Sequence, residues 1–249
     1  MNNIGCFSNK KSRASKTPEE IYNNDSSFSH IISQQQFDPI NYRAISQIIF
    51  ETEREIDMRT VIHIYQQLTQ SQQIEHIDWE VIGFQNKENI KSDFRAVGLL
   101  GLLNLLYFMG QDLAKVRQIY ELSTDKVQNY PFMLACFNIT NLTLRLLNND
   151  KITSQLINLH EEKNAFVALQ EYYIALLKRF DERWRNEKLK INDFNVTLDQ
   201  IEIESKKDIV KFIQKNGQTQ SSINGMKNMN NSKKQKGGKG LNQTDFSNI

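Results

Sequence analysis

Apolar side chains recur every three or four residues through the middle of the chain, which is the spacing of amphipathic helices. This pattern predicts helices over residues 41–56, 58–69, 94–109, 112–122, 131–147, 164–187 and 197–214. The clearest of them is 164–187, whose apolar face consists of Phe166, Leu169, Tyr173, Leu176, Leu177, Phe180 and Trp184. No alternating strand pattern and no internal repeat is visible, so the sequence predicts an all-α fold.

The segment 94–109 is apolar nearly all round and is therefore expected at the centre of the fold, surrounded by other helices. Gly98 and Gly101 would allow a neighbouring element to approach closely. Ser92 or Asp93 is expected to cap the start of this helix, because both side chains can accept a hydrogen bond from a free backbone N–H.

The same pattern predicts the apolar face of two other helices and the polar face of a third. Helix 41–56 is expected to place four isoleucines near one face: Ile45, Ile48, Ile49 and Ile56. Helix 58–69 is expected to do the same with Val61, Ile64, Tyr65 and Leu68. In helix 164–187 four charged residues are expected to face away from the core: Lys178, Arg179, Asp181 and Glu182. Helix 197–214 is polar and expected to be peripheral.

The two ends of the chain differ in composition from its middle. Residues 1–36 and 215–249 are rich in Ser, Asn, Gln, Lys or Gly and contain few large apolar side chains, so both are expected to be disordered. The sequence thus predicts a single compact helical domain over residues 37–214. Cys6 and Cys136 have dissimilar surroundings and suggest no disulfide, and the N-terminus has no apolar stretch of signal-peptide length, so we expect a cytoplasmic protein.

Charge is distributed unevenly along the chain. Residues 1–18 hold four Lys or Arg and no acid, and residues 215–240 hold six Lys and no acid. Residues 19–214 hold 21 basic and 28 acidic side chains, a net charge of −7. The basic ends are either solvated tails or contacts to an anionic membrane surface, and the acidic body argues against a nucleic-acid partner.

The sequence lacks the motifs of common catalytic and cofactor sites. The four histidines are scattered without ligand spacing, and there is no GxxxxGK[ST] or GxGxxG loop and no GxSxG elbow. We therefore expect no metal, no cofactor and no covalent chemistry performed by this chain.

One segment carries a specific motif. Residues 79–108 read WEVIGFQNKENIKSDFRAVGLLGLLNLLYF, and residues 130–140 read YPFMLACFNIT. The first resembles the signature of the ELMO domain, especially of the stand-alone ELMOD type: Trp, Gly-Phe-Gln, a spacer with a proline, Thr-Asp-Phe-Arg-Gly and a Leu-rich helix. The second resembles the Tyr-Pro-Phe segment of the same family, and together the likeness covers residues 40–190.

The segment departs from the family pattern at several positions. Asn89 or Ile90 stands where the proline is expected, and the spacer between Gln85 and Asp93 is one residue longer. Ser92 replaces Thr, and Ala96 replaces the glycine that follows the arginine. These differences put the activity in question more than the fold.

The resemblance implies a GTPase-activating protein for a GTP-bound small GTPase of the Arf/Arl family, with the arginine of the DFR segment required. In this chain that residue is Arg95, as an arginine finger supplied in trans. Asp93 would orient it or act as a cap, and Gln85, Phe84 and Phe94 would contact the partner.

Each of these assignments has an alternative. Arg95 would instead be structural if it were enclosed and paired with an acid, whereas a finger must be exposed. Gln85 can be a loop anchor, and Phe84 and Phe94 can be core residues. The domain as a whole can be a non-catalytic adaptor, since ELMO domains also occur in scaffolds that bind DOCK-type exchange factors.

Overall fold

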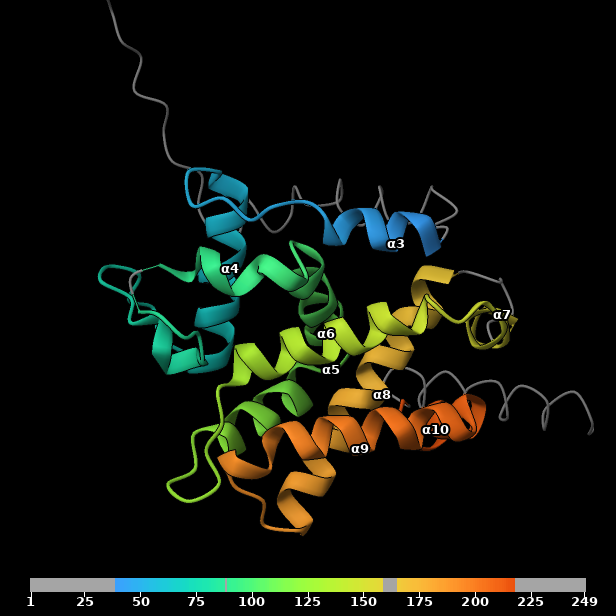
Figure 1. Ribbon diagram of the computed structural model, residues 1–249. Coiled ribbons are helices and arrows are strands. Elements are labelled where there is room, and N and C mark those ends of the chain that lie inside the picture. Colours follow the sequence, from blue (N-terminus) through green and yellow to red (C-terminus); the bar gives the residue numbers. More distant parts are fainter. Residues whose placement is uncertain (1–38, 88, 159–164, 218–249) are drawn as a thin grey trace, which may run out of the picture. The chain divides into compact units, whose positions relative to one another are not determined.

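The computed structural model describes residues 39–87, 89–158 and 165–217, all within one compact unit (Figure 1). Its elements in chain order are α3 Pro39–Ser46, α4 Glu55–Thr69, the 3₁₀ helices η1 Trp79–Ile82 and η2 Ile90–Ala96, α5 Leu100–Ser123, α6 Phe132–Leu146, α7 Asp150–Asn158, α8 Ala165–Asn186, the 3₁₀ helix η3 Ile191–Asp193, α9 Phe194–Lys207 and α10 Ile209–Asn216. No strand occurs among these residues, and the predicted all-α fold is confirmed. The predicted disordered leader lies outside the described residues, as does all but the first three residues of the predicted tail.

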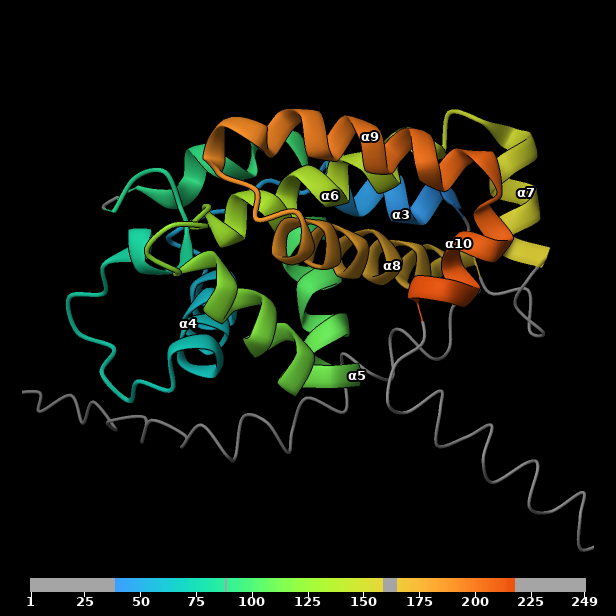
Figure 2. The same ribbon diagram turned by 90° about the horizontal axis from the view of Figure 1, so that it is seen from below.

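Helix α8 runs through the middle of the bundle and contacts α3, α5, α6, α7, α9 and α10 (Figure 2). All seven residues of its predicted apolar face are buried, because neighbours cover it along its whole length. Asp181 corrects the prediction: this carboxylate is buried rather than turned outward. It accepts hydrogen bonds from Lys115 at 2.7 Å and Arg185 at 3.0 Å, so two cations compensate its burial.

The prediction for residues 41–56 is wrong in its second half. Helix α3 ends at Ser46, and residues 47–54 form a linker that leads to α4. The backbone oxygen of Ile48 accepts a hydrogen bond from Leu99 N (3.0 Å), a tertiary contact that a continuous helix would not permit. Ile48 and Ile49 are consequently exposed rather than packed into the core.

The predicted start of helix 94–109 is also wrong. Residues 90–96 form the 3₁₀ helix η2, and the α-helix begins only at Leu100. Neither Ser92 nor Asp93 caps it: Asn89 caps η2 by accepting from Lys91 N at 3.1 Å. Helix α5 is interrupted at Asp112, whose φ of −159° and ψ of 73° lie outside the helical region, so the predicted boundary between 94–109 and 112–122 survives as a kink.

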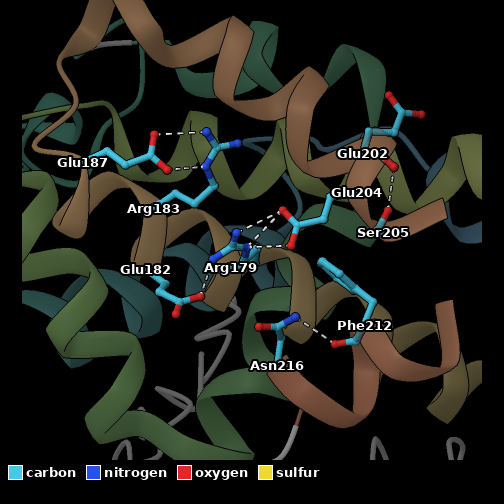
Figure 3. A network of polar contacts seen from close by, with 9 residues as sticks. All are labelled: Arg179, Glu182, Arg183, Glu187, Glu202, Glu204, Ser205, Phe212 and Asn216. Carbon is cyan, nitrogen blue, oxygen red and sulfur yellow. Dashed lines mark hydrogen bonds and ion pairs between the residues drawn. The ribbon is translucent and has the colours of Figure 1, made fainter. Parts of the chain in front are cut away.

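The polar segment predicted at 197–214 is two helices, and they are not peripheral. Helices α9 and α10 meet at Asp208 and both pack against α8. Ile201 and Phe212 are among their buried residues. On the outside, Arg179 of α8 binds both carboxylate oxygens of Glu204 on α9, at 3.0–3.2 Å (Figure 3). Helix α7 was not predicted, because only two of its nine residues, Thr153 and Leu156, are buried.

Close approach at the two predicted glycines is confirmed. Gly98 lies in the turn between η2 and α5 at a φ of 51°, and a Cβ there would meet the backbone oxygens of Ser46 and Ile48. Gly101 is in α5, where a Cβ would meet the ring of Phe137 at 2.6 Å. These contacts bring the ends of α3 and η2 together and seat α6 on α5.

A buried group of polar side chains joins the helices at the centre. Asn104 of α5 accepts hydrogen bonds from Tyr42 Oη (2.9 Å) and Gln170 Nε2 (2.7 Å) and donates one to Thr140 Oγ1 (3.2 Å). Asn104, Tyr42, Thr140 and Gln170 have no exposed surface. One amide therefore connects α3, α5, α6 and α8 in a single register.

Among the described residues no single helix is long and apolar enough to cross a membrane. The pair η2 and α5, bent by 91°, passes that test by length and composition alone.

Replacing Gly98 by alanine is expected to lower the free energy of unfolding by about 3 kcal/mol, because a Cβ at positive φ would also clash with two carbonyl oxygens. Gly110→Ala is the matched control: nothing lies within 4 Å of its Cβ position, and alanine in a helix should raise stability by about 0.5–1 kcal/mol. Urea unfolding followed by circular dichroism measures both. Equal stability of the two variants would contradict the assigned turn.

Replacing Asn104 by alanine is expected to lower the free energy of unfolding by about 2–4 kcal/mol, since it removes three buried hydrogen bonds and leaves Tyr42 Oη and Gln170 Nε2 unsatisfied. Tyr42→Phe removes one of these bonds and should cost about 1 kcal/mol. The double variant should lose less stability than the sum of the two single losses, because both substitutions remove the same hydrogen bond. Strict additivity in thermal or urea unfolding would show that the two side chains do not interact.

Candidate functional site

The motif begins with a short helix that is tied to α6. Asp78 caps η1 by accepting from Glu80 N at 3.1 Å, and Gly83 ends it at a φ of 91°. The Gly83 oxygen then accepts from Leu134 N at 3.3 Å. A Cβ at Gly83 would meet the backbone of Pro131 and Phe132, so the two family-like segments of the sequence are in direct contact.

The spacer after Gly83 is closed by its own side chains. Asp93 Oδ2 accepts a hydrogen bond from Gln85 N at 2.8 Å and thus joins the two ends of the loop. Within it, Asn86 Oδ1 accepts from Asn89 N at 3.0 Å. Of the two residues that stand where the family proline is expected, Asn89 caps η2 and Ile90 begins it. The loop with the longer spacer is thus closed by hydrogen bonds of its own residues.

Aromatic rings hold the underside of η2. Phe94 stacks on Phe50 with centroids 4.1 Å apart and planes 6° apart, and it packs on Phe137 of α6 at 4.8 Å. Phe84 lies 5.8 Å from Phe94, and Trp79 lies 6.1 Å from Phe84. Phe84 and Phe94 each have 3% of their surface exposed, so they would touch a partner only after a rearrangement of the loop.

Arg95 follows Phe94 directly and lies on the surface. Among the arginines of residues 39–87, 89–158 and 165–217, Arg95 alone makes no hydrogen bond or ion pair. The other described arginines are all bonded: Arg43, Arg54, Arg59, Arg117, Arg145, Arg179, Arg183 and Arg185. The exposure that a finger requires is therefore present, while the enclosed ion pair that would make Arg95 structural is not found among these residues.

Asp93 and Arg95 are near each other in sequence, but Asp93 bonds within the loop and does not pair with Arg95. One Asp93 oxygen binds Gln85 N, and the other accepts from Ser92 Oγ at 3.4 Å. The carboxylate is thus directed into the loop, and in the described structure it makes no ion pair with Arg95. Gln85 contributes its backbone N–H to this closure, and its side chain is exposed. A contact of Gln85 with a partner stays a prediction.

The linker between α3 and α4 is a part of this site that the sequence did not indicate. It passes beside η2 and contributes Phe50 to the ring stack (Figure 1). The only local signal was the isoleucine pair at 48–49, which the helical periodicity assigned to the core.

Other polar groups of the protein are occupied with structural tasks. In Figure 3, Arg179 of α8 pairs with Glu204 of α9 at 3.0 Å, and Arg183 of α8 pairs with Glu187, which directly follows that helix, at 2.8 Å. Burial raises the pKa of the Cys136 thiol to about 12, so it stays protonated and is not a nucleophile. No group of His, Cys, Asp or Glu suited to a metal ion is found in the described part of the chain.

The comparisons with known proteins agree with the motif. The sequence model of the ELMO/CED-12 family matches residues 40–198. ELMO domain-containing protein 3 of Homo sapiens is 27% identical over 168 residues, which are 66% of this chain and 43% of that protein. ELMO domain-containing protein 2 of Bos taurus is 32% identical over 119 residues, 47% of this chain and 40% of the relative.

A third relative shows a similar degree of likeness. ELMO domain-containing protein B of Dictyostelium discoideum is 31% identical over 139 residues, 55% of this chain and 47% of the relative. The chain thus spans less than half the length of each of these relatives. No solved structure matches it. The family match covers well over half of the chain and includes both motif segments, and the chain belongs to the ELMO/CED-12 family.

Proposed function

We propose that this domain stimulates GTP hydrolysis by a small GTPase of the Arf/Arl family, with Arg95 as the arginine supplied in trans. The observation that carries the proposal is the state of Arg95: it is exposed and, within the described residues, has no hydrogen bond or ion pair. Membership of the ELMO/CED-12 family supports it, because the DFR segment that ELMOD-type activators require is intact here.

The chemistry needs a guanidinium and little else from this chain. During phosphoryl transfer, negative charge is spread over the γ-phosphate oxygens, and an arginine inserted from outside stabilises that charge. Arginine suits the task because its planar group stays protonated and can donate two parallel hydrogen bonds. The nucleotide and its magnesium ion are held by the GTPase, so the activator needs no cofactor of its own.

The surroundings of Arg95 favour such an insertion. Its backbone is held by the buried ring of Phe94 on one side and by the Gly98 turn on the other. A fixed backbone limits the ordering cost in a complex to the side chain itself, and a side chain without hydrogen bonds has none to break before it contacts the partner. Ala96, which replaces the family glycine, is exposed.

We place this activity in the cytoplasm, on a GTP-bound partner. The basic ends of the chain are candidates for a contact with anionic membrane surface, where each lysine contributes on the order of 1 kcal/mol. Binding of the protein to vesicles with and without anionic lipid tests this contact.

Arg95→Ala and Arg95→Lys are expected to lower the stimulated rate of single-turnover GTP hydrolysis by about 10³ or more, because neither residue can form the bidentate contact. A panel of Arf and Arl GTPases would be measured with each variant. Arg59→Ala is the control, since this exposed arginine of α4 pairs with Glu55 on the same helix and should leave stimulation unchanged.

The result also separates the two candidate functions. The activator is supported if the unmodified protein stimulates hydrolysis and Arg95→Ala, with its helical fold intact, does not. Absence of stimulation for every GTPase of the panel would overturn the proposal and favour the adaptor that binds an exchange factor.

Asp93→Ala is expected to reduce stimulation about tenfold, because it releases Gln85 N and opens the loop that precedes η2. Asp93→Asn keeps an oxygen that can accept this bond and should retain most of the activity. Both are measured in the same hydrolysis assay. If Asp93→Asn were as inactive as Arg95→Ala, the charge of Asp93 would act on the arginine or the nucleotide, contrary to the loop-closing role.

A further inference from the structure

Two large apolar side chains stand exposed beside the segment that carries Arg95. Ile48 is 44% exposed and Ile49 is 64% exposed, and within the described ranges they are the exposed large apolar residues that adjoin each other in sequence. Single exposed apolar side chains are common on protein surfaces, whereas an adjoining pair next to a candidate catalytic arginine calls for an explanation.

The exposure of this pair is built into the fold. The backbone oxygen of Ile48 accepts a hydrogen bond from Leu99 N at 3.0 Å. Phe50, two residues later, stacks on Phe94. The linker is held further along by Glu51 N, which donates to Asp57 Oδ2 at 3.0 Å. The linker is thus anchored at Ile48, Phe50 and Glu51, on both sides of Ile49. These contacts hold the backbone in the conformation that exposes the two isoleucine side chains.

The same anchors place the pair next to Arg95. Residues 94 and 99, which bind the linker, lie on either side of Arg95 in sequence. Because consecutive Cα atoms are about 3.8 Å apart, Ile49 lies close to the segment that presents the arginine. The linker runs along η2 in this region (Figure 1).

Charged residues follow the pair in sequence. Glu51 and Glu53 lie in the linker, and the exposed Lys91 lies in η2. The pKa of Glu53 is lowered first by a hydrogen bond from its own backbone, then by one from Thr52, and further by the charge of Lys91. Exposed apolar side chains beside an arginine form a surface that a partner protein can cover.

We propose that Ile48 and Ile49 dock against an apolar surface of the same GTPase whose nucleotide Arg95 reaches. The inference rests on the proposed function and adds the surface that holds the partner. The occupant is the GTPase because a protein close enough to present its γ-phosphate to Arg95 also covers the linker beside it. The apolar contact provides affinity and orientation, and the arginine acts in the transition state.

The two roles predict different kinetic effects. Ile49→Ser, alone and with Ile48→Ser, should raise the domain concentration needed for half-maximal stimulation about tenfold or more and leave the maximal rate nearly unchanged. Arg95→Ala should instead remove the maximal rate and leave binding to the GTPase, loaded with a non-hydrolysable GTP analogue, within about threefold of the unmodified protein. Ile203→Ser is the matched control, an isoleucine of α9 that is 61% exposed and should behave as the unmodified protein.

The outcomes distinguish the two proposals. If the unmodified protein stimulates hydrolysis and Ile49→Ser matches Ile203→Ser in both parameters, the docking surface is wrong and the activator stands. If no stimulation occurs but Ile49→Ser still weakens binding to the loaded GTPase, the docking surface stands and the activator is wrong. If neither stimulation nor binding is found, both are overturned. Unfolding curves of the serine variants should match that of the unmodified protein, since both side chains are exposed.

Discussion

The packing of the Phe94 ring is the interaction on which the site depends. Phe94 lies between Phe50 of the linker and Phe137 of α6, so three segments far apart in sequence meet at one side chain. The residue that follows it is Arg95, which is therefore presented from a fixed backbone. The Gly98 turn provides the second fixed point, because only a residue without a Cβ allows the backbone of α3 to come so close.

The periodic helices could be predicted from the sequence because their burial is one-sided and regular. Helix α8 is the best example: the residues predicted to be buried from Phe166 to Trp184 are all buried. Helix α4 is another, with Val61, Ile64 and Leu68 buried as expected. The site motif was also recognisable, since it is contiguous in sequence and its aromatic and glycine positions have fixed spacing.

What could not be predicted is decided by tertiary contacts that override local periodicity. The isoleucines at 48 and 49 continue the helical spacing of α3, but the bond from Leu99 to Ile48 and the Phe50 ring stack hold the chain in another conformation. The same holds for Asp93, whose sequence position suits a helix cap but whose carboxylate is used by Gln85. The linker conformation and the role of Asp93 both depend on a contact with a residue at least eight positions away. A local sequence pattern holds no information on such contacts.

The distribution of bonded and unbonded arginines gives the site its functional meaning. An exposed guanidinium readily finds a carboxylate on a surface with more acids than bases, and the other arginines of the described structure each have a partner. Arg95 lies two residues from Asp93, yet that carboxylate is occupied by Gln85 N. The loop thus closes through the Asp93 carboxylate, which binds Gln85 N. In the described structure Arg95 remains exposed beside it without a hydrogen bond or ion pair.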